Sequence, residues 1–292
     1  MKKIAIATVL AVAAIAAQAQ VTVGGRLSTW VDSTKTGTAA SLTSVTADPT
    51  SNITIRATED LGSGLSARVV IDTKILANDP RAADSQIGDR QSTVGLASKF
   101  GSVDLGRNTH TAFNTIRDND AFGALYGSVG TDIHNSRGSR ISNGVFASVT
   151  PLKGVTASYN SAQNATGVNA TSYGVTGAIG PVVASAARYT AGNDTTDVLS
   201  ARGTIAKTTL FYTHSEDKGT VAKTGNTYGV SQQLTNTVAV KASYGETNTG
   251  VKAYALGGDY LFSKRTQVGV AYRKVDTVAD IKQIAVGLTH RF

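Results

Sequence analysis

The chain of 292 residues contains no cysteine, 4 prolines, 1 tryptophan and 1 methionine. The absence of cysteine excludes a disulfide scaffold and a thiolate zinc site. Because prolines are few and no stretch is dominated by serine, proline or one charge sign, no linker is evident and one domain is favoured over two. Hydrophobic residues make up only 41% of the chain, which also contains 30 glycines and is poor material for a thick soluble core.

The N-terminal segment has the pattern of a secretory signal. Lys2 and Lys3 precede an apolar run at 4–17, and the small-residue pattern Ala-Gln-Ala follows at 17–19. The run is shorter than the roughly 20 residues that a membrane-spanning helix requires, and it ends in a typical cleavage site. We therefore expect residues 1–19 to be a signal peptide and residues 20–292 to form the mature domain. An exported chain without cysteine suits a Gram-negative envelope.

Beyond residue 20, apolar and polar residues alternate with the period of a β-strand. At 21–31, valine and leucine side chains occupy one face, whereas Thr22, Arg26 and Ser28 occupy the other. The pattern predicts sixteen strands, at 21–31, 51–59, 65–74, 91–99, 102–108, 140–149, 154–162, 169–179, 181–190, 197–207, 208–216, 225–234, 237–247, 252–262, 266–275 and 282–292. The fold class is therefore all-β.

The connections between these segments alternate in length. Tight turns are expected at 61–64, 100–102, 150–154, 180–181, 207–208, 235–237 and 263–265, and longer polar loops begin with 32–50 and 75–90. An even number of antiparallel strands with short turns at one end is typical of an outer-membrane barrel. Closure satisfies every backbone group in hydrocarbon, and sixteen strands enclose an aqueous lumen. A soluble sandwich is disfavoured because the polar face carries many arginines.

Four stretches resemble the trimeric general-diffusion porins of Gram-negative bacteria, and the beta-proteobacterial type most. They are EDLGSGLSA at 59–67, DRQSTVGLASKFGSVDLGRN at 89–108, RISNGVFAS at 140–148 and VGLTHRF at 286–292. They fall in family order and bracket most of the mature chain. The resemblance implies a 16-stranded antiparallel transmembrane β-barrel with an inward-folded third loop, located in the outer membrane. Thr93 stands where the family has an aromatic residue and the chain is short, so fourteen strands remain an alternative.

One long interval, between Asn108 and Arg140, lacks clean alternation, and in the family it is the third external loop, which narrows the barrel. The resemblance assigns its acids Asp118, Asp120 and Asp132 to the constriction. The opposite wall of the family carries a basic ladder, matched here by Arg26, Arg90 and Arg140. On the second strand the family's arginine falls near Asn52, so that position is either lost or replaced by Arg56. An excess of arginine favours anions, because guanidinium groups are always charged and weakly hydrated.

The resemblance also implies partners. Arg107 is out of phase with Asp104 and is expected at the subunit interface of a homotrimer, where the second loop (75–90) of a neighbour docks. Phe292 is expected to be the signal read by the barrel-assembly machinery, a role compatible with an aromatic at the lipid interface. The remaining expected partners are outer-membrane lipid, lipopolysaccharide, small hydrophilic solutes and inorganic ions.

The function predicted is passive diffusion through a water-filled channel, with an anion preference. The alternatives are a solute-specific channel and a plugged structural or adhesive barrel. An enzyme is not expected, because Asp132, His134 and Ser136 share a loop without a nucleophile elbow. Metal ligands at useful spacing and a phosphate-binding loop are absent from the sequence, so no metal or cofactor is expected. Nucleic acid is not an expected partner, because no stacking aromatics accompany the dispersed arginines.

Overall fold

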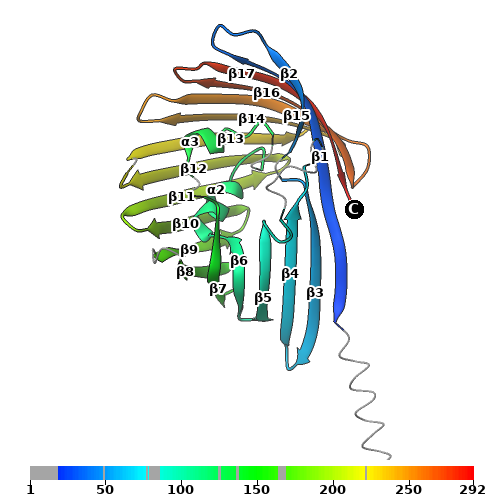
Figure 1. Cartoon of the computed structure of the whole chain (residues 1–292), viewed down its shortest axis with the longest axis vertical. Coiled ribbons are helices and arrows are strands. Elements are labelled where there is room, and N and C mark those ends of the chain that lie inside the picture. The colour runs from blue at the N-terminus through cyan, green and yellow to red at the C-terminus, as the bar shows by residue number, and fades with distance from the viewer. Residues whose placement is uncertain are drawn as a thin grey trace, which may run out of the picture.

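The structure is a computed structural model that describes residues 19–48, 50–76, 78, 86–123, 126–135, 138–163, 169–220 and 222–292 (Figure 1). Residues 1–18 of the expected signal peptide and Ser136 lie outside the described residues. Within the described part of the chain, no helix has the length and apolar character needed to cross a membrane.

The described chain forms one antiparallel sheet of seventeen strands and two short helices. The elements are β1 (Gln20–Thr36), β2 (Leu42–Ala47), β3 (Asn52–Gly62), β4 (Leu65–Lys74), β5 (Gln91–Ser98), β6 (Gly101–Thr109), α2 (Thr111–Arg117), α3 (Gly130–Ile133), β7 (Arg140–Leu152), β8 (Val155–Gln163), β9 (Asn169–Ile179), β10 (Val182–Ala191), β11 (Asp194–Ile205), β12 (Thr208–Lys218), β13 (Lys223–Gln233), β14 (Val238–Thr247), β15 (Lys252–Leu261), β16 (Thr266–Asp276) and β17 (Ile281–Arg291).

The sheet closes on itself because β17 pairs with β1, with Leu27 opposite His290 and Lys35 opposite Lys282. The strands β2 and β3 share one position in the wall: β2 pairs with the second half of β1, and β3 pairs with the first half. The barrel therefore has sixteen strand positions, as predicted, and the fourteen-stranded alternative is excluded. Closure leaves no unpaired edge, which is what a sheet in hydrocarbon requires.

The prediction of a polar loop at 32–50 is wrong in part. Strand β1 continues to Thr36, and β2 follows after a short turn. The sequence LTSVTA of β2 is rich in β-branched residues but polar, so it resembles a loop. Ser44 and Thr46 of β2 both donate hydrogen bonds to the carboxylate of Asp32 on β1, and these bonds use the hydroxyl groups that made the segment look unstructured.

All seven predicted tight turns are present, at the end of the barrel opposite the connection between β6 and β7. The first joins β3 to β4 through Gly62, Ser63 and Gly64, which all have positive φ (85°, 54° and 77°). Glycine adopts this left-handed conformation without the steric cost that a Cβ imposes. These turns fix the register of each hairpin and thereby the face on which each side chain lies.

The exposed face of the sheet is apolar. Ile284, Val286 and Leu288 on β17 are 61%, 50% and 53% exposed, whereas Ala285 and Thr289, which belong to the alternate positions, are buried. Four tyrosines on this face lie directly opposite one another on β12 to β15: Tyr212, Tyr228, Tyr244 and Tyr254. Their ring centroids are 5.3, 6.4 and 5.1 Å apart. An outward apolar band with an aromatic girdle is the surface that lipid requires.

Candidate functional site

The segment between β6 and β7 packs against the face opposite the exposed apolar side chains. Helix α2 contacts β8 to β11, and its Ala112 and Ile116 pack in a buried cluster with Val198 of β11. Val198 alternates with Leu199, which is 55% exposed on the other face. In Figure 1, α2 and α3 accordingly lie within the curve of the sheet.

At the start of helix α2, side chains of the barrel wall accept hydrogen bonds from the first backbone N–H groups of the helix. His110 is the N-cap, and its Nδ1 accepts a hydrogen bond from the amide of Phe113 at 3.2 Å. The next two amides donate to wall side chains: Thr111 to Asn160 Oδ1 at 2.7 Å, and Ala112 to Ser172 Oγ at 3.0 Å. Because the first amides of a helix have no partner within the helix, these contacts determine where α2 sits.

Helix α3 is fixed to β13 and β14 by a buried isoleucine and a buried histidine. Ile133 is 0% exposed, and it fills space that Gly225 and Gly245 leave open. A Cβ at either glycine would lie 2.7 or 2.5 Å from an Ile133 carbon. The ring of His134 bonds to Ser215 Oγ at 2.7 Å and to Thr227 Oγ1 at 3.0 Å. Burial, assisted by nearby Lys223 and His214, lowers the pKa of His134 from 6.5 to about 3, so the ring is neutral.

The segment between β6 and β7 also stacks on β1 through Tyr126, which we call the tip of the loop. The rings of Tyr126 and Trp30 are 4.8 Å apart at an interplanar angle of 11°. Trp30 lies flat over Gly287 of β17 and Gly269 of β16, where a Cβ would come within 2.1 and 2.7 Å of its indole. The loop is therefore attached to the wall at three separated places: α2, α3 and the tip.

The three predicted constriction acids have different surroundings. Asp118 is exposed and pairs with Arg117 at 2.8 Å. Asp120 accepts from the amide of Phe122 at 2.7 Å and from Ser128 Oγ at 2.6 Å, so its carboxylate holds the backbone of the loop. Asp132 accepts two hydrogen bonds from the guanidinium of Arg273 on β16. Asp118 and Asp132 thus have cationic partners, whereas Asp120 accepts hydrogen bonds from neutral groups.

Two basic residues on the wall beneath the loop were not found from the sequence. Arg273 neutralises Asp132, and Lys241 pairs with Asp259 at 2.6 Å, with its ammonium 5.8 Å from the centre of the Phe122 ring. Alternation places both lysine and arginine on the polar face. It does not indicate that the loop reaches them, because that contact joins distant parts of the chain.

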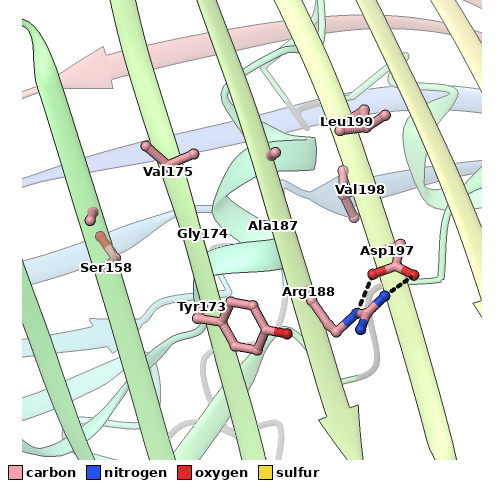
Figure 2. A pocket seen from close by; sticks show the side chains of 11 residues that line it. Ser158, Tyr173, Gly174, Val175, Ala187, Arg188, Asp197, Val198 and Leu199 are labelled. Atoms are coloured by element: carbon pink, nitrogen blue, oxygen red, sulfur yellow. Dashed lines mark hydrogen bonds and ion pairs between the residues drawn. The ribbon is translucent and has the colours of Figure 1, made fainter.

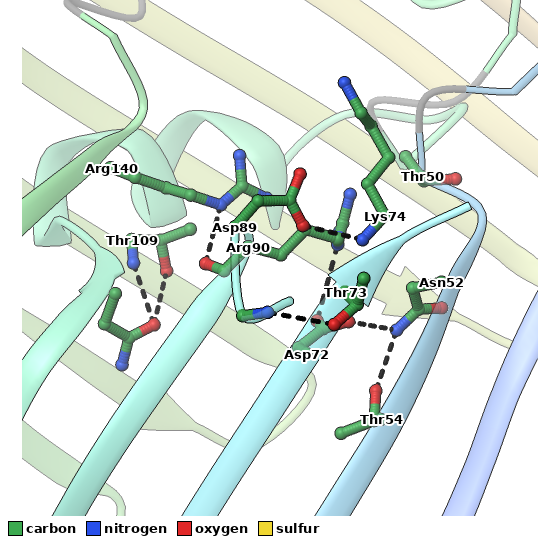
Figure 3. Close-up of polar contacts among 12 residues, drawn as sticks. Thr50, Asn52, Thr54, Asp72, Thr73, Lys74, Asp89, Arg90, Thr109 and Arg140 are labelled. Carbon is green, nitrogen blue, oxygen red and sulfur yellow. Dashed lines mark hydrogen bonds and ion pairs between the residues drawn. The ribbon is translucent and has the colours of Figure 1, made fainter. Parts of the chain in front are cut away.

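Arg90 and Arg140 lie around the starts of β5 and β7 (Figure 3), and Arg26 lies on β1, opposite Asn52 of β3. Arg140 Nε donates to the carbonyl of Arg90 at 2.8 Å, and Asn52, opposite Arg26, donates to the Asp72 carboxylate that also pairs with Arg90. Arg90 Nε is 3.4 Å from Asp72 Oδ2.

The position of the expected fourth arginine is occupied by Asn52, which donates to Asp72 Oδ1 at 2.7 Å and to Thr54 Oγ1 at 2.8 Å. Arg56 lies further along β3 on the same face, opposite Thr22, and is exposed. Two other arginines of the polar face are engaged: Arg68 with the carboxylate of Asp104, and Arg202 with the carbonyl of Asp118 at 2.9 Å.

The two remaining predicted residues lie on or near the barrel exterior. Arg107 Nε donates to the carbonyl of Asp89 at 2.6 Å, and its Nη1 donates to Ser142 Oγ at 2.5 Å. Phe292 exchanges two backbone hydrogen bonds with Gly25, each 3.1 Å long. Its ring covers Gly25, where a Cβ would lie 2.8 Å from the ring. The last residue is therefore part of the closure between β17 and β1.

Among the described residues, no group of three or more histidine, aspartate or glutamate side chains is arranged to hold a metal ion. The imidazole of His134 is buried and bonded to two hydroxyl groups, as described above. A closed sixteen-position barrel with an apolar exterior, a polar interior and a loop packed on its inner wall defines a membrane-spanning β-barrel protein.

The comparison with known proteins gives the family. The Gram-negative porin family model matches residues 7–280, so the chain belongs to the Gram-negative porin family and its barrel lies in the outer membrane. Outer membrane porin protein 32 of Delftia acidovorans is 34% identical over 129 residues, which are 42% of this chain and 36% of that protein. Major outer membrane protein P.IB of Neisseria meningitidis is 36% identical over 114 residues, 37% of this chain and 34% of that protein. These matches span about a third of each relative.

Solved structures show the same fold. An anion-selective porin from Comamonas acidovorans superposes with a TM-score of 0.82 at 22% identity, covering 94% of this chain and 100% of that one. OmpF of Salmonella typhi superposes with a TM-score of 0.78 at 17% identity, covering 94% and 98%. At these identities the likeness establishes the barrel architecture alone.

Proposed function

We propose that this protein is a passive diffusion channel of the outer membrane, non-enzymatic, which admits small hydrophilic solutes and inorganic ions and prefers anions. Family membership and the polar inner face support the channel. The name of the Comamonas structure describes that porin as anion-selective, which agrees with the proposal.

The observation that carries the anion preference is the unequal pairing of charges. Two of the three loop acids have arginine partners, since Asp132 binds Arg273 and Asp118 binds Arg117, and the Asp120 carboxylate is hydrogen-bonded within the loop. In contrast, Arg26, Arg56 and Arg140 form no ion pair with a carboxylate of the described residues. The lumen therefore carries an excess of guanidinium charge. At physiological salt the screening length is about 8 Å, so this charge acts across a narrow passage.

The proposal includes a constriction formed between the loop and the basic wall. Its support is the packing of α2 and α3 on β8 to β15, which leaves Arg26, Arg90 and Arg140 across the lumen. A barrel of sixteen strands is otherwise wide enough to hold an open aqueous channel. Anions attracted by guanidinium groups pass without tight binding, as conduction requires.

The proposal also includes a homotrimer. Aromatic side chains project outward from β8, β9 and β12 to β16, whereas the described residues of β1 and β3 to β7 carry none on their outward face. A wall without an aromatic girdle is suited to another protein rather than to the lipid interface. Arg107 lies on β6 within this wall, as expected for an interface residue. Phe292 is proposed as the residue read by the barrel-assembly machinery.

Planar-bilayer recording with the purified protein tests the function. A diffusion channel gives ohmic current steps that grow with salt concentration. Current that one particular solute blocks at low concentration would identify a solute-specific channel instead. Absence of current from protein that migrates as a folded oligomer would identify a plugged barrel and contradict the proposal.

A further inference from the structure

The seven tight turns carry charged side chains of one sign only. Short turns of outer-membrane barrels lie on the periplasmic side. The residues that connect the strands at this end include basic side chains and no carboxylate; the basic residues are Lys99, Lys153, Lys207, Lys264 and Arg265. All of them are exposed. We call these residues the turn cations.

The turn cations are distributed around the rim of the barrel. They belong to the turns β5–β6, β7–β8, β11–β12 and β15–β16, and the strands follow one another around the sheet in chain order (Figure 1). Neighbouring turns are two strands apart, which corresponds to about 10 Å or more along the rim. The positive charge therefore surrounds the periplasmic mouth and is not confined to one wall.

The turn cations form no ion pair with a carboxylate of the described residues. The ammonium of Lys99 lies 5.0 Å from the centre of the Phe100 ring, a contact that leaves its charge in place. Two acids, Glu59 and Asp60, stand at the end of β3 before the first turn. They are outnumbered by the turn cations, so this mouth carries net positive charge.

The positive charge continues from the rim into the lumen at the closure of the barrel. The amide of Arg291 donates to the carbonyl of Arg265 at 2.8 Å, and Arg291 lies directly opposite Arg26. Arg291 Nη1 donates to Gln267 Oε1 at 3.0 Å, a neutral acceptor that does not compensate its charge. Three arginines thus connect the periplasmic mouth with the basic wall.

The long-loop end of the barrel has a different charge pattern, because acids and bases are interspersed there. Arg188 on β10 donates to both oxygens of Asp197 on β11, at 2.5 and 2.8 Å (Figure 2). Lys282 at the start of β17 lies 3.3 Å from Asp280. These charges compensate one another within the chain. The two ends of the barrel therefore differ in fixed charge.

Fixed charge around a channel mouth raises the local concentration of ions of opposite sign and the rate at which they enter, and the effect falls with ionic strength. The screening length is about 8 Å at physiological salt and about 30 Å at 0.01 M. At physiological salt each turn cation acts mainly on ions that pass close to it. In dilute medium the turn cations act together on the whole mouth.

From this difference between the two ends we infer that the turn cations are a second determinant of selectivity, which speeds the entry of small anions from the periplasmic mouth. The anions are attracted without tight binding, as conduction requires. Because the channel is passive, the same charges slow release into the periplasm, so the effect appears in currents and not in the equilibrium distribution. The inference rests on the proposed diffusion function and adds a direction to it.

The test records single-channel currents at voltages of equal size and opposite sign, in symmetric potassium chloride at about 0.01 M. The current should be roughly twofold larger when chloride enters from the periplasmic mouth. The ratio of the two currents should approach one at about 1 M salt, where the screening length is about 3 Å. Replacing all turn cations by glutamine should also bring the ratio close to one, while the channel still prefers anions.

The absence of native cysteine allows a matched pair of variants in which one charge is reversed during recording. In Lys153→Cys, the thiolate attacks a sulfonated methanethiosulfonate, a disulfide forms and methanesulfinate leaves, so a positive position becomes negative. The current ratio should then fall toward one. Lys252→Cys is the control at the opposite end, where Lys252 is exposed at the start of β15, and the same reagent should not lower its ratio.

The orientation of each channel is read from a maleimide polymer too large to enter the lumen, which reaches the cysteine of Lys153→Cys only from the periplasmic side. The inference is overturned if the unmodified channel conducts equally in both directions at low salt. It is also overturned if the asymmetry is independent of salt, survives loss of all turn cations, or falls equally in Lys252→Cys. Absence of current or a cation preference in the unmodified protein would instead contradict the proposed function.

Discussion

Asp132, between β6 and β7, accepts hydrogen bonds from Nε and Nη2 of Arg273 on β16, although 141 residues separate them in the chain. The side chains of both residues are only 19% exposed. Asp132 adjoins Ile133 and His134, which are both buried in the wall. The pair therefore holds the loop at the point where it is most deeply buried.

The first prediction concerns this pair. Arg273→Gln should weaken docking of the loop by about 2 kcal/mol, because it leaves the carboxylate of Asp132 without its charged donor. Single-channel recordings should show more frequent closures and greater open-channel noise. Arg273→Gln/Asp132→Asn removes both charges and should be less noisy than Arg273→Gln alone. Additive effects of the two substitutions would show that the pair does not couple the loop to the wall.

The second prediction concerns the basic wall. Replacement of Arg26, Arg90 and Arg140 by glutamine should lower the ratio of anion to cation permeability by roughly tenfold or more at low salt, because each charge contributes about 0.5–1 kcal/mol in a watery lumen and the three together about 1.5–3 kcal/mol. The effect should shrink as salt rises. The control Arg68→Gln/Asp104→Asn removes a neutral pair and should leave the ratio unchanged. An unchanged permeability ratio in the triple variant would show that these arginines do not determine the ion selectivity of the channel.

The third prediction concerns the space that glycine leaves for the loop. Gly245→Ala places a methyl group 2.5 Å from Ile133 Cγ1 and should destabilise docking by about 1–3 kcal/mol. Adding Ile133→Ala should relieve that clash. Gly177→Ala is the matched control, since nothing lies within 4 Å of its added Cβ. Thermal unfolding and channel noise give the measurement, and equal effects of the two glycine substitutions would contradict the packing described here.

The fourth prediction concerns pH. The pKa of docked His134 is lowered to about 3, and the ring in a detached loop recovers its ordinary value of 6.5. Between these values the detached loop binds a proton and the docked loop does not. Docking therefore weakens as pH falls below 6.5, by about 1.4 kcal/mol per pH unit, and levels off near pH 3. Channel closures should increase from pH 7 to pH 5, and His134→Gln should remove most of that increase.

Much of the barrel could be predicted from the sequence, because a strand's alternation and a turn's glycines are local properties. Strand β2 was the exception: it is only six residues long, three of them carry hydroxyl groups, and Ser44 and Thr46 are held by the buried Asp32, a contact that alternation does not reveal. The alternation also placed Arg26 and Phe292 on their correct faces. Register followed from the tight turns, each of which fixes one pair of strands.

The loop could be located from the sequence but its contacts could not. The pairing of Asp132 with Arg273 depends on how the loop crosses the lumen, and no local pattern encodes that path. The carboxylate of Asp120 likewise turns inward to Phe122 and Ser128, which the spacing of acids does not show.

A water-filled lumen with an excess of guanidinium charge is expected to cross the membrane. The most direct test is the zero-current potential of the unmodified protein in a planar bilayer, with potassium chloride more concentrated on one side. We predict stable ohmic channels whose zero-current potential has the sign of chloride selectivity. A potential of the opposite sign, from channels of normal conductance, would contradict the account.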